Sequence, residues 1–182
     1  NVEYHSKQDI VDYYNEHPFD GDMDTKYKEE PDVFAPYNLG SLTQKTIDNA
    51  QNMVNVVRYV AGLSGMTVED ASLSKSAQAA ALANAANGEL SHYPTRPRDM
   101  SDNMYNLAKE GASSSNIAMT SGRMTLPMSI RMYLSDADSG NRSRVGHRRW
   151  ILYPTLYKIG FGQVEGYTAT RVIGGERNYS AK

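Results

Sequence analysis

The stretch that most constrains how this chain can fold runs from Ser143 to Pro154 and reads SRVGHRRWILYP. It contains the only tryptophan, Trp150, and one of only four histidines, His147. Valine, tryptophan, isoleucine and leucine favour an extended backbone, and a proline interrupts one. The pattern therefore predicts a buried strand over residues 146–152 that ends in a turn at Pro154.

Side chains alternate between the two faces of a strand, so this strand would carry His147, Arg149 and Ile151 on one face. A face that presents an imidazole and a guanidinium is costly to bury, and it usually lines a cavity or meets a partner. In the alternative interpretation, the arginines are solvated and His147 is a hydrogen-bonded core histidine. Composition alone leaves both interpretations open.

Residues 146–154 read GHRRWILYP, and residues 159–162 read IGFG. This pair of segments resembles the signature of bacterial CAP-superfamily domains, the SCP-like relatives of plant pathogenesis-related proteins, cysteine-rich secretory proteins and venom antigens. A second similarity lies upstream, where residues 116–118 read NIA. The resemblance implies a CAP domain over residues 41–182 after an N-terminal extension over residues 1–40. Relatives commonly run somewhat further, which implies a cleaved or truncated C-terminal end.

The rest of the chain shows helical patterns first and strand patterns last. Capping residues and apolar spacing predict helices over residues 9–15, 41–61, 73–87, 99–109 and 125–135. The second helix begins with a predicted capping box at Ser41 and Gln44, and the third with Ser72 or Ser74 as its cap. Alternation predicts strands over residues 158–164 and 167–173, joined by a turn at Glu165-Gly166, and a further strand near residues 117–120. This order predicts an α+β fold, which the resemblance sharpens to a three-layer α-β-α sandwich with a small, mostly antiparallel sheet.

The composition excludes several classes of protein. The net charge is −2, so general attraction to nucleic acid is not expected. The chain has no cysteine, hence no disulfide framework, and no apolar run approaches the roughly eighteen residues of a membrane span. The sequence contains no phosphate loop, no Gly-x-Ser-x-Gly elbow and no His-Glu-x-x-His helix. The chain begins at Asn1 without a methionine or a signal peptide, which we interpret as a mature or trimmed form.

The resemblance implies a cavity in which two histidines face each other. His92, in the Leu-x-His sequence after a predicted helix, takes the place of the first, and His147 takes the place of the second. CAP domains usually show Gly-Glu-Asn where this chain has Ser-Ser-Asn over residues 114–116, so Ser115 replaces the cavity glutamate. The predicted cavity residues are His92, His147, Ser115, Asn116 and Arg149.

The acidic half of the familiar site is therefore degenerate in this sequence. No glutamate matches the second cavity carboxylate of the relatives, and Asp136 and Asp138 are weak substitutes. Neutral imidazole suits Zn²⁺, but a stable site normally needs three or four protein ligands, or three and a water. We expect His92 and His147 to bind a divalent cation such as zinc weakly or not at all, with no cofactor certain.

Three classes of function follow. The leading one is a non-enzymatic binding domain, secreted or on the bacterial cell surface, for an extracellular peptide, lipid or cell-wall component, because a shared fold does not fix function. The second is a metal-binding or metal-modulated protein that uses His92 and His147. The third is a hydrolase in which one of these histidines activates Ser115. The sequence identifies no orienting carboxylate and no oxyanion motif, so we assign no catalytic residue.

Overall fold

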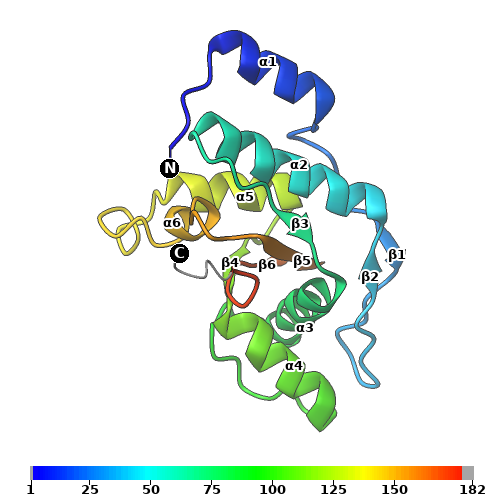
Figure 1. The fold of residues 1–182 in the computed structure, drawn as a ribbon. Coiled ribbons are helices and arrows are strands. Elements are labelled where there is room, and N and C mark those ends of the chain that lie inside the picture. Colours follow the sequence, from blue (N-terminus) through cyan, green and yellow to red (C-terminus); the bar gives the residue numbers. More distant parts are fainter. Residues whose placement is uncertain (1, 178–182) are drawn as a thin grey trace.

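The computed structural model describes residues 2–177, and in it a small sheet lies between two groups of helices (Figure 1). The sheet consists of β3 (Val68–Glu69), β5 (Lys158–Val164), β6 (Tyr167–Arg171) and β4 (Ser115–Met119), in that spatial order. The helices are α2 (Gln44–Val60) and α5 (Leu126–Ser135) on one face, and α3 (Ala71–Asn87) and α4 (Asp102–Ser113) on the other (Figure 1). This layering confirms the predicted α-β-α sandwich. Residues 178–182, at the C-terminal end whose truncation the resemblance implies, lie outside the described part of the chain.

The sheet is mostly antiparallel, as predicted. Strands β5 and β6 form the expected hairpin, with Val164 opposite Tyr167, and β4 runs antiparallel to the far side of β6. Only β3 is parallel to its neighbour β5. The sequence did not reveal β3, because two residues are too few to show an alternating pattern.

Helix α3 packs directly against the backbone of β5. A Cβ atom at Gly160 would lie 2.3 Å from the backbone carbon of Leu73, and one at Gly162 would lie 2.3 Å from the backbone nitrogen of Gln78. Only glycine fits such an approach, and the alanine-rich face of α3 keeps the helix thin. The Ser74 hydroxyl accepts the N–H of Phe161 at 3.1 Å, so the helix also partners the outer edge of the strand.

The predicted helices are present within a few residues of the expected bounds, but the predicted N-caps of two of them are wrong. Residues Ser41–Leu42 form strand β2, which pairs with β1 (Tyr27–Glu29), so Ser41 does not open a capping box. Thr43 is the N-cap of α2, and its hydroxyl accepts the N–H of Thr46 at 3.3 Å. Asp70, rather than Ser72 or Ser74, is the N-cap of α3. A side chain just outside the first turn is placed to accept the free N–H groups there.

The predicted strand over residues 146–152 is also wrong. Helix α6 (Arg148–Ile151) occupies this position, after a series of turns. The N–H of Arg149 donates to the carbonyl of Val145 at 3.1 Å, and that of Leu152 to the carbonyl of Arg148 at 3.0 Å. These local bonds satisfy the backbone where a strand would have needed a neighbouring strand. The predicted sharing of a strand face by His147, Arg149 and Ile151 therefore does not exist.

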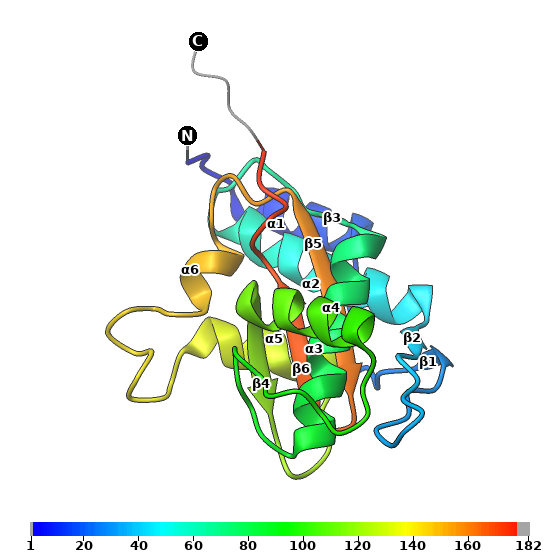
Figure 2. The same ribbon diagram turned by 90° about the horizontal axis from the view of Figure 1, so that it is seen from below.

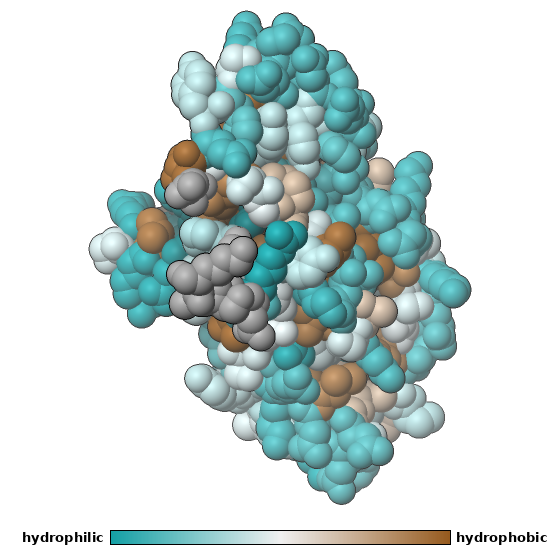
Figure 3. Space-filling model, in the orientation of Figure 1, coloured by the Kyte–Doolittle hydropathy of each residue, from teal (hydrophilic) through white to brown (hydrophobic). Residues whose placement is uncertain are grey.

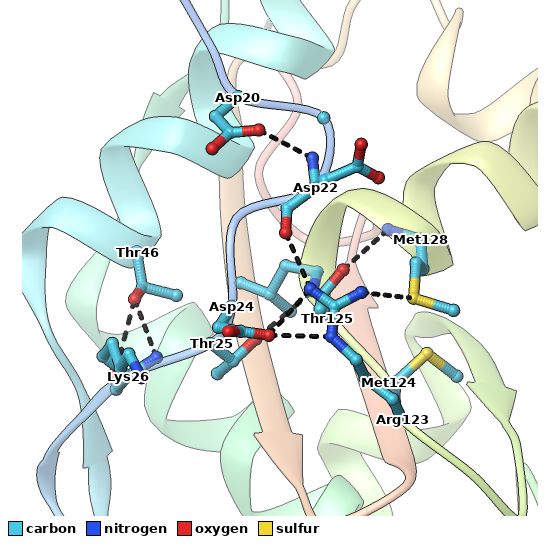
Figure 4. Close-up of polar contacts among 12 residues, drawn as sticks. Asp20, Asp22, Asp24, Thr25, Lys26, Thr46, Arg123, Met124, Thr125 and Met128 are labelled. Carbon is cyan, nitrogen blue, oxygen red and sulfur yellow. Dashed lines mark hydrogen bonds and ion pairs between the residues drawn. The ribbon is translucent and has the colours of Figure 1, made fainter.

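The N-terminal segment is bound to the rest of the chain at many points. It begins with α1 (Lys7–Glu16), none of whose residues is fully buried. Further on, the Arg123 guanidinium donates to the Asp24 carboxylate at 2.8 Å and to the carbonyl of Asp22 at 2.7 Å (Figure 4). The Thr25 hydroxyl donates to the side chain of Gln163 in β5 at 2.6 Å. The segment before residue 41 thus contacts α5 and the sheet as well as α2.

The surface shown in Figure 3 is mostly hydrophilic, with separate apolar patches between polar side chains. Among the described residues, no helix is both long and apolar enough to cross a membrane.

Candidate ligand-binding cleft

Asp136 holds the imidazole of His147 in place. Asp136 ends α5 in a left-handed backbone conformation, with φ of 44°, and is 1% exposed. Its carboxylate accepts the ring Nδ1–H of His147 at 2.8 Å. It also accepts the backbone N–H groups of His147, at 3.1 Å, and of Arg148, at 2.9 Å. One buried side chain therefore starts α6 and orients the ring.

His92 lies in the loop between α3 and α4. The side chain of Asn84 forms a pair of 3.2 Å bonds to the backbone of Ser91, which fixes the start of this loop on α3. The Nδ1 atom of His92 then lies 2.8 Å from the carbonyl oxygen of Ala112 in α4. His92 itself is exposed, whereas the His147 side chain is only 19% exposed.

The two imidazole rings are in the same tautomer. A carbonyl oxygen and an ionised carboxylate only accept, so Nδ1 of each neutral ring carries the proton and Nε2 carries a lone pair. Within the described residues, neither Nε2 atom has a hydrogen-bond partner. His92 and His147 thus each offer one unused acceptor.

Both histidines line a cleft with two adjoining lobes. One lobe has a volume of about 550 Å³ and is polar; its other walls include Ser115, Asn116, Arg144, Arg149 and Trp150. The second lobe has a volume of about 450 Å³ and is more apolar; its other walls include Leu90, Ile117, Met119, Met132 and Tyr133. His92, His147 and Asn141 belong to both lobes. The structure therefore places all five predicted cavity residues around the polar lobe.

Ser115 and Asn116 differ in what their side chains do. The amide of Asn116 donates to the carbonyl of His147 at 3.1 Å, which joins β4 to the start of α6. Ser115 is 5% exposed, and its buried Oγ atom has no hydrogen-bond partner among the described residues. The Ser115 hydroxyl is therefore not held in a hydrogen bond by His92 or His147.

The charged side chains around the polar lobe are basic. Arg144 and Arg149 are both exposed at its wall. The guanidinium of Arg149 lies 5.2 Å from the centre of the Trp150 ring, in a cation–π contact. A carboxylate or phosphate that enters this lobe would therefore meet two fixed positive charges and the only tryptophan.

The role of Asp136 could not be derived from the sequence, which identified no orienting carboxylate. The sequence indicates Asp136 only as a weak substitute for a glutamate ligand, since nothing in the chain before residue 147 shows that the loop after α5 folds back. Ligand atoms of Asp136, Asp138 and His147 lie within 4.8 Å of one another. Asp136 already accepts the ring N–H of His147, so these residues do not fit a stable zinc site.

An α-β-α sandwich with a histidine-lined cleft at the edge of its sheet is the architecture that the resemblance implied. The family model described as CAP, the cysteine-rich secretory protein family, matches residues 51–174. This protein therefore belongs to the CAP family, although it contains no cysteine. No curated protein and no solved structure matched the chain.

Proposed function

We propose that this protein is a secreted or cell-surface bacterial binding domain without enzymatic activity, and that it binds an extracellular ligand in the cleft between His92 and His147. The observation that carries the proposal is the set of unsatisfied polar groups around one lobe. The Nε2 lone pairs of His92 and His147 border the same space and lack partners among the described residues. A polar ligand would supply those partners.

The two lobes suggest the kind of ligand. Arg144 and Arg149 favour an anionic group in the polar lobe, and Met119, Met132 and Leu90 favour an apolar group in the other. Because the histidines belong to both lobes, one ligand that carries both groups can fill the cleft past the imidazoles.

The arrangement supports hydrolysis less well. Asp136 and His147 form the orienter and base of a possible triad, but the Ser115 hydroxyl is not hydrogen-bonded to either histidine. Alternation along β4 also turns Ser115 away from Asn116, the residue that contacts His147. We therefore assign no nucleophile.

Trp150 gives this proposal a built-in reporter. In a screen of small fragments by two-dimensional NMR, we expect hits to shift the indole N–H of Trp150 and the backbone signals of β4. His92→Ala with His147→Ala should weaken these hits, while His5→Ala and His17→Ala, which lie on the far side of α2, should not. Hits that cluster elsewhere, or that are unaffected by the double substitution, would contradict the proposal.

The absence of catalysis has its own test. Wild-type protein and the Ser115→Ala variant should be equally inactive on a panel of ester and peptide substrates. Turnover by the wild type that Ser115→Ala abolishes would show instead that the hydrolase interpretation is correct.

A further inference from the structure

The floor of the cleft is the free edge of the sheet. Strand β4 is the outermost strand beside β6, and Figure 2 shows it on the side from which the loop after α5 projects. The polar lobe is bordered by Ser115 and Asn116, and the apolar lobe by Ile117, Ala118 and Met119. The two lobes together therefore follow the whole length of β4.

The register of β4 decides which of its backbone groups face the cleft. Thr120 donates its N–H to Gly166 at 3.0 Å, and Val172 donates to Ser114 at 3.1 Å. In an antiparallel ladder, bonded residues alternate with residues whose N–H and C=O groups point away from the partner strand. Counting from these two bonds, the residues that point outward are Ser115, Ile117 and Met119.

These outward backbone groups have no partner among residues 2–177. None of the three N–H groups and none of the three carbonyl groups forms a hydrogen bond to backbone or side chain within that part of the chain. On the opposite side of the sheet, where β5 extends beyond β3, the Ser74 and Gln78 side chains of α3 accept the outward N–H groups of Phe161 and Gln163. The backbone groups without a partner are therefore those of the β4 residues that line the cleft.

We propose that the ligand of the cleft is an extended peptide that pairs with β4 as an additional strand. This inference rests on the proposed function and specifies its ligand. Donors and acceptors that alternate along a strand are matched by the backbone of another extended chain. Strand β4 has five residues and is about 17 Å long, so it accommodates a segment of similar length.

The walls of the cleft specify the ends of this peptide. A carboxylate belongs at the end beside Arg144 and Arg149, and an apolar side chain belongs at the end beside Met119 and Met132. His92 and His147 would flank the middle of the bound segment and offer their Nε2 atoms to its polar side chains. An exposed edge usually invites association with other sheets, but Ser115, Ile117 and Ala118 on this edge are only 4–6% exposed, so the edge is reached through the two lobes alone.

Selection from a phage-displayed library of heptapeptides tests the inference. We expect immobilised protein to enrich sequences with an acidic residue towards one end and an apolar residue towards the other. The enriched peptide is then synthesised with single N-methyl groups at each position. Methylation at alternate positions should reduce affinity at least tenfold, and methylation between them should have little effect, because only every second N–H faces β4.

Two substitutions at Met119 provide a matched comparison on the protein. Met119→Pro removes an outward N–H and spares the bonds to β6, so it should abolish peptide binding while the protein still folds. Met119→Ala keeps that N–H and removes only the contact of the methionine side chain, so it should lose clearly less affinity than Met119→Pro. Amide exchange gives a second readout: addition of the peptide should slow exchange at residues 115, 117 and 119, whereas residues 116 and 118 should be protected already.

The outcomes separate this inference from the proposed function. Pairing with β4 is overturned if no peptide is enriched. It is also overturned if N-methylation has the same effect on affinity at every position of the peptide. Fragments that still bind beside Trp150 in that case leave the proposed function standing. If neither fragments nor peptides bind in the cleft, both proposals are wrong.

Discussion

The carboxylate of Asp136 and the imidazole of His147 are joined by a 2.8 Å hydrogen bond, and the same carboxylate accepts two backbone N–H groups at the start of α6. The ring of His147 therefore cannot turn without breaking the connection between α5 and α6. Its Nε2 atom is held towards the cleft as a consequence of backbone structure. The Nε2 atom of His147 is a free acceptor because Asp136 binds the opposite ring nitrogen.

Asp136→Asn should change the tautomer of this ring. An asparagine amide can present N–H₂ where the carboxylate presented oxygen, so the His147 proton is expected to move from Nδ1 to Nε2. Nitrogen-15 NMR of the imidazoles measures this directly. We also expect a loss of about 2 kcal/mol in the free energy of unfolding, since a single neutral amide oxygen replaces the charged carboxylate that accepts the buried N–H groups. Asp138→Asn is the control and should leave the His147 tautomer unchanged.

Zinc chloride should bind weakly or not at all at neutral pH. Two imidazoles fall short of the three or four ligands of a stable site, and Asp136 is already hydrogen-bonded. Isothermal titration calorimetry measures the affinity. Ser115→Glu would add a carboxylate at the wall of the polar lobe and should strengthen binding. Tight one-to-one binding by the wild type that is lost in His92→Ala would contradict the prediction.

Arg58 should be among the most sensitive positions for stability. Its side chain is 0% exposed, and it donates to the backbone carbonyl groups of Gly65, Ile151, Tyr153 and Leu156. Arg58→Met leaves these buried acceptors without their donor, and we expect a loss of about 3 kcal/mol or more in urea denaturation. The exposed Arg98→Met control should change stability by less than about 0.5 kcal/mol. Similar values for the two variants would contradict the role of Arg58.

Gly162→Ala tests the contact between α3 and β5. The added Cβ would lie 2.3 Å from the backbone nitrogen of Gln78, so the helix must move away from the strand. We expect a loss of about 3 kcal/mol or failure to fold, measured by thermal denaturation. At Gly122 a Cβ would meet no atom within 4 Å, and Gly122→Ala should be almost neutral. A stable Gly162→Ala variant would mean that α3 can shift freely.

Asp70 should make stability depend on acid pH. Its hydrogen bond with Lys158, at 2.8 Å, is the main reason that the pKa of Asp70 is well below its usual range. The stabilisation is therefore complete above the unfolded-state pKa of about 3.9 and is lost as the pH falls through the lower folded-state pKa. Asp70→Asn retains a good N-cap without the charge. The difference in unfolding free energy between wild type and Asp70→Asn should shrink steadily below about pH 4; a constant difference would exclude this role.

Local patterns were sufficient for the helices and the hairpin. Apolar spacing in α2, the alanine-rich α3 ending at Gly88, and the turn at Glu165-Gly166 are short-range signals, and they carry the information within one segment. The resemblance added the positions of His92 and His147. These parts of the fold and of the candidate site could therefore be predicted from the sequence.

For residues 146–152 the sequence predicted the wrong secondary structure, a strand in place of α6. The run has strand-forming composition, but Arg58, 93 residues from Ile151, and Asp136, 12 residues from Arg148, supply the donors and acceptors that suit a helical turn. The free acceptor atoms of the histidines and the unpaired edge of β4 likewise depend on which segments lie beside them. The sequence by itself determined the segments of the longer helices α1 to α5 and of the hairpin, because their hydrogen bonds are local. Tertiary structure alone decided the conformation after residue 146 and the composition of the cleft, because those depend on partners from other segments of the chain.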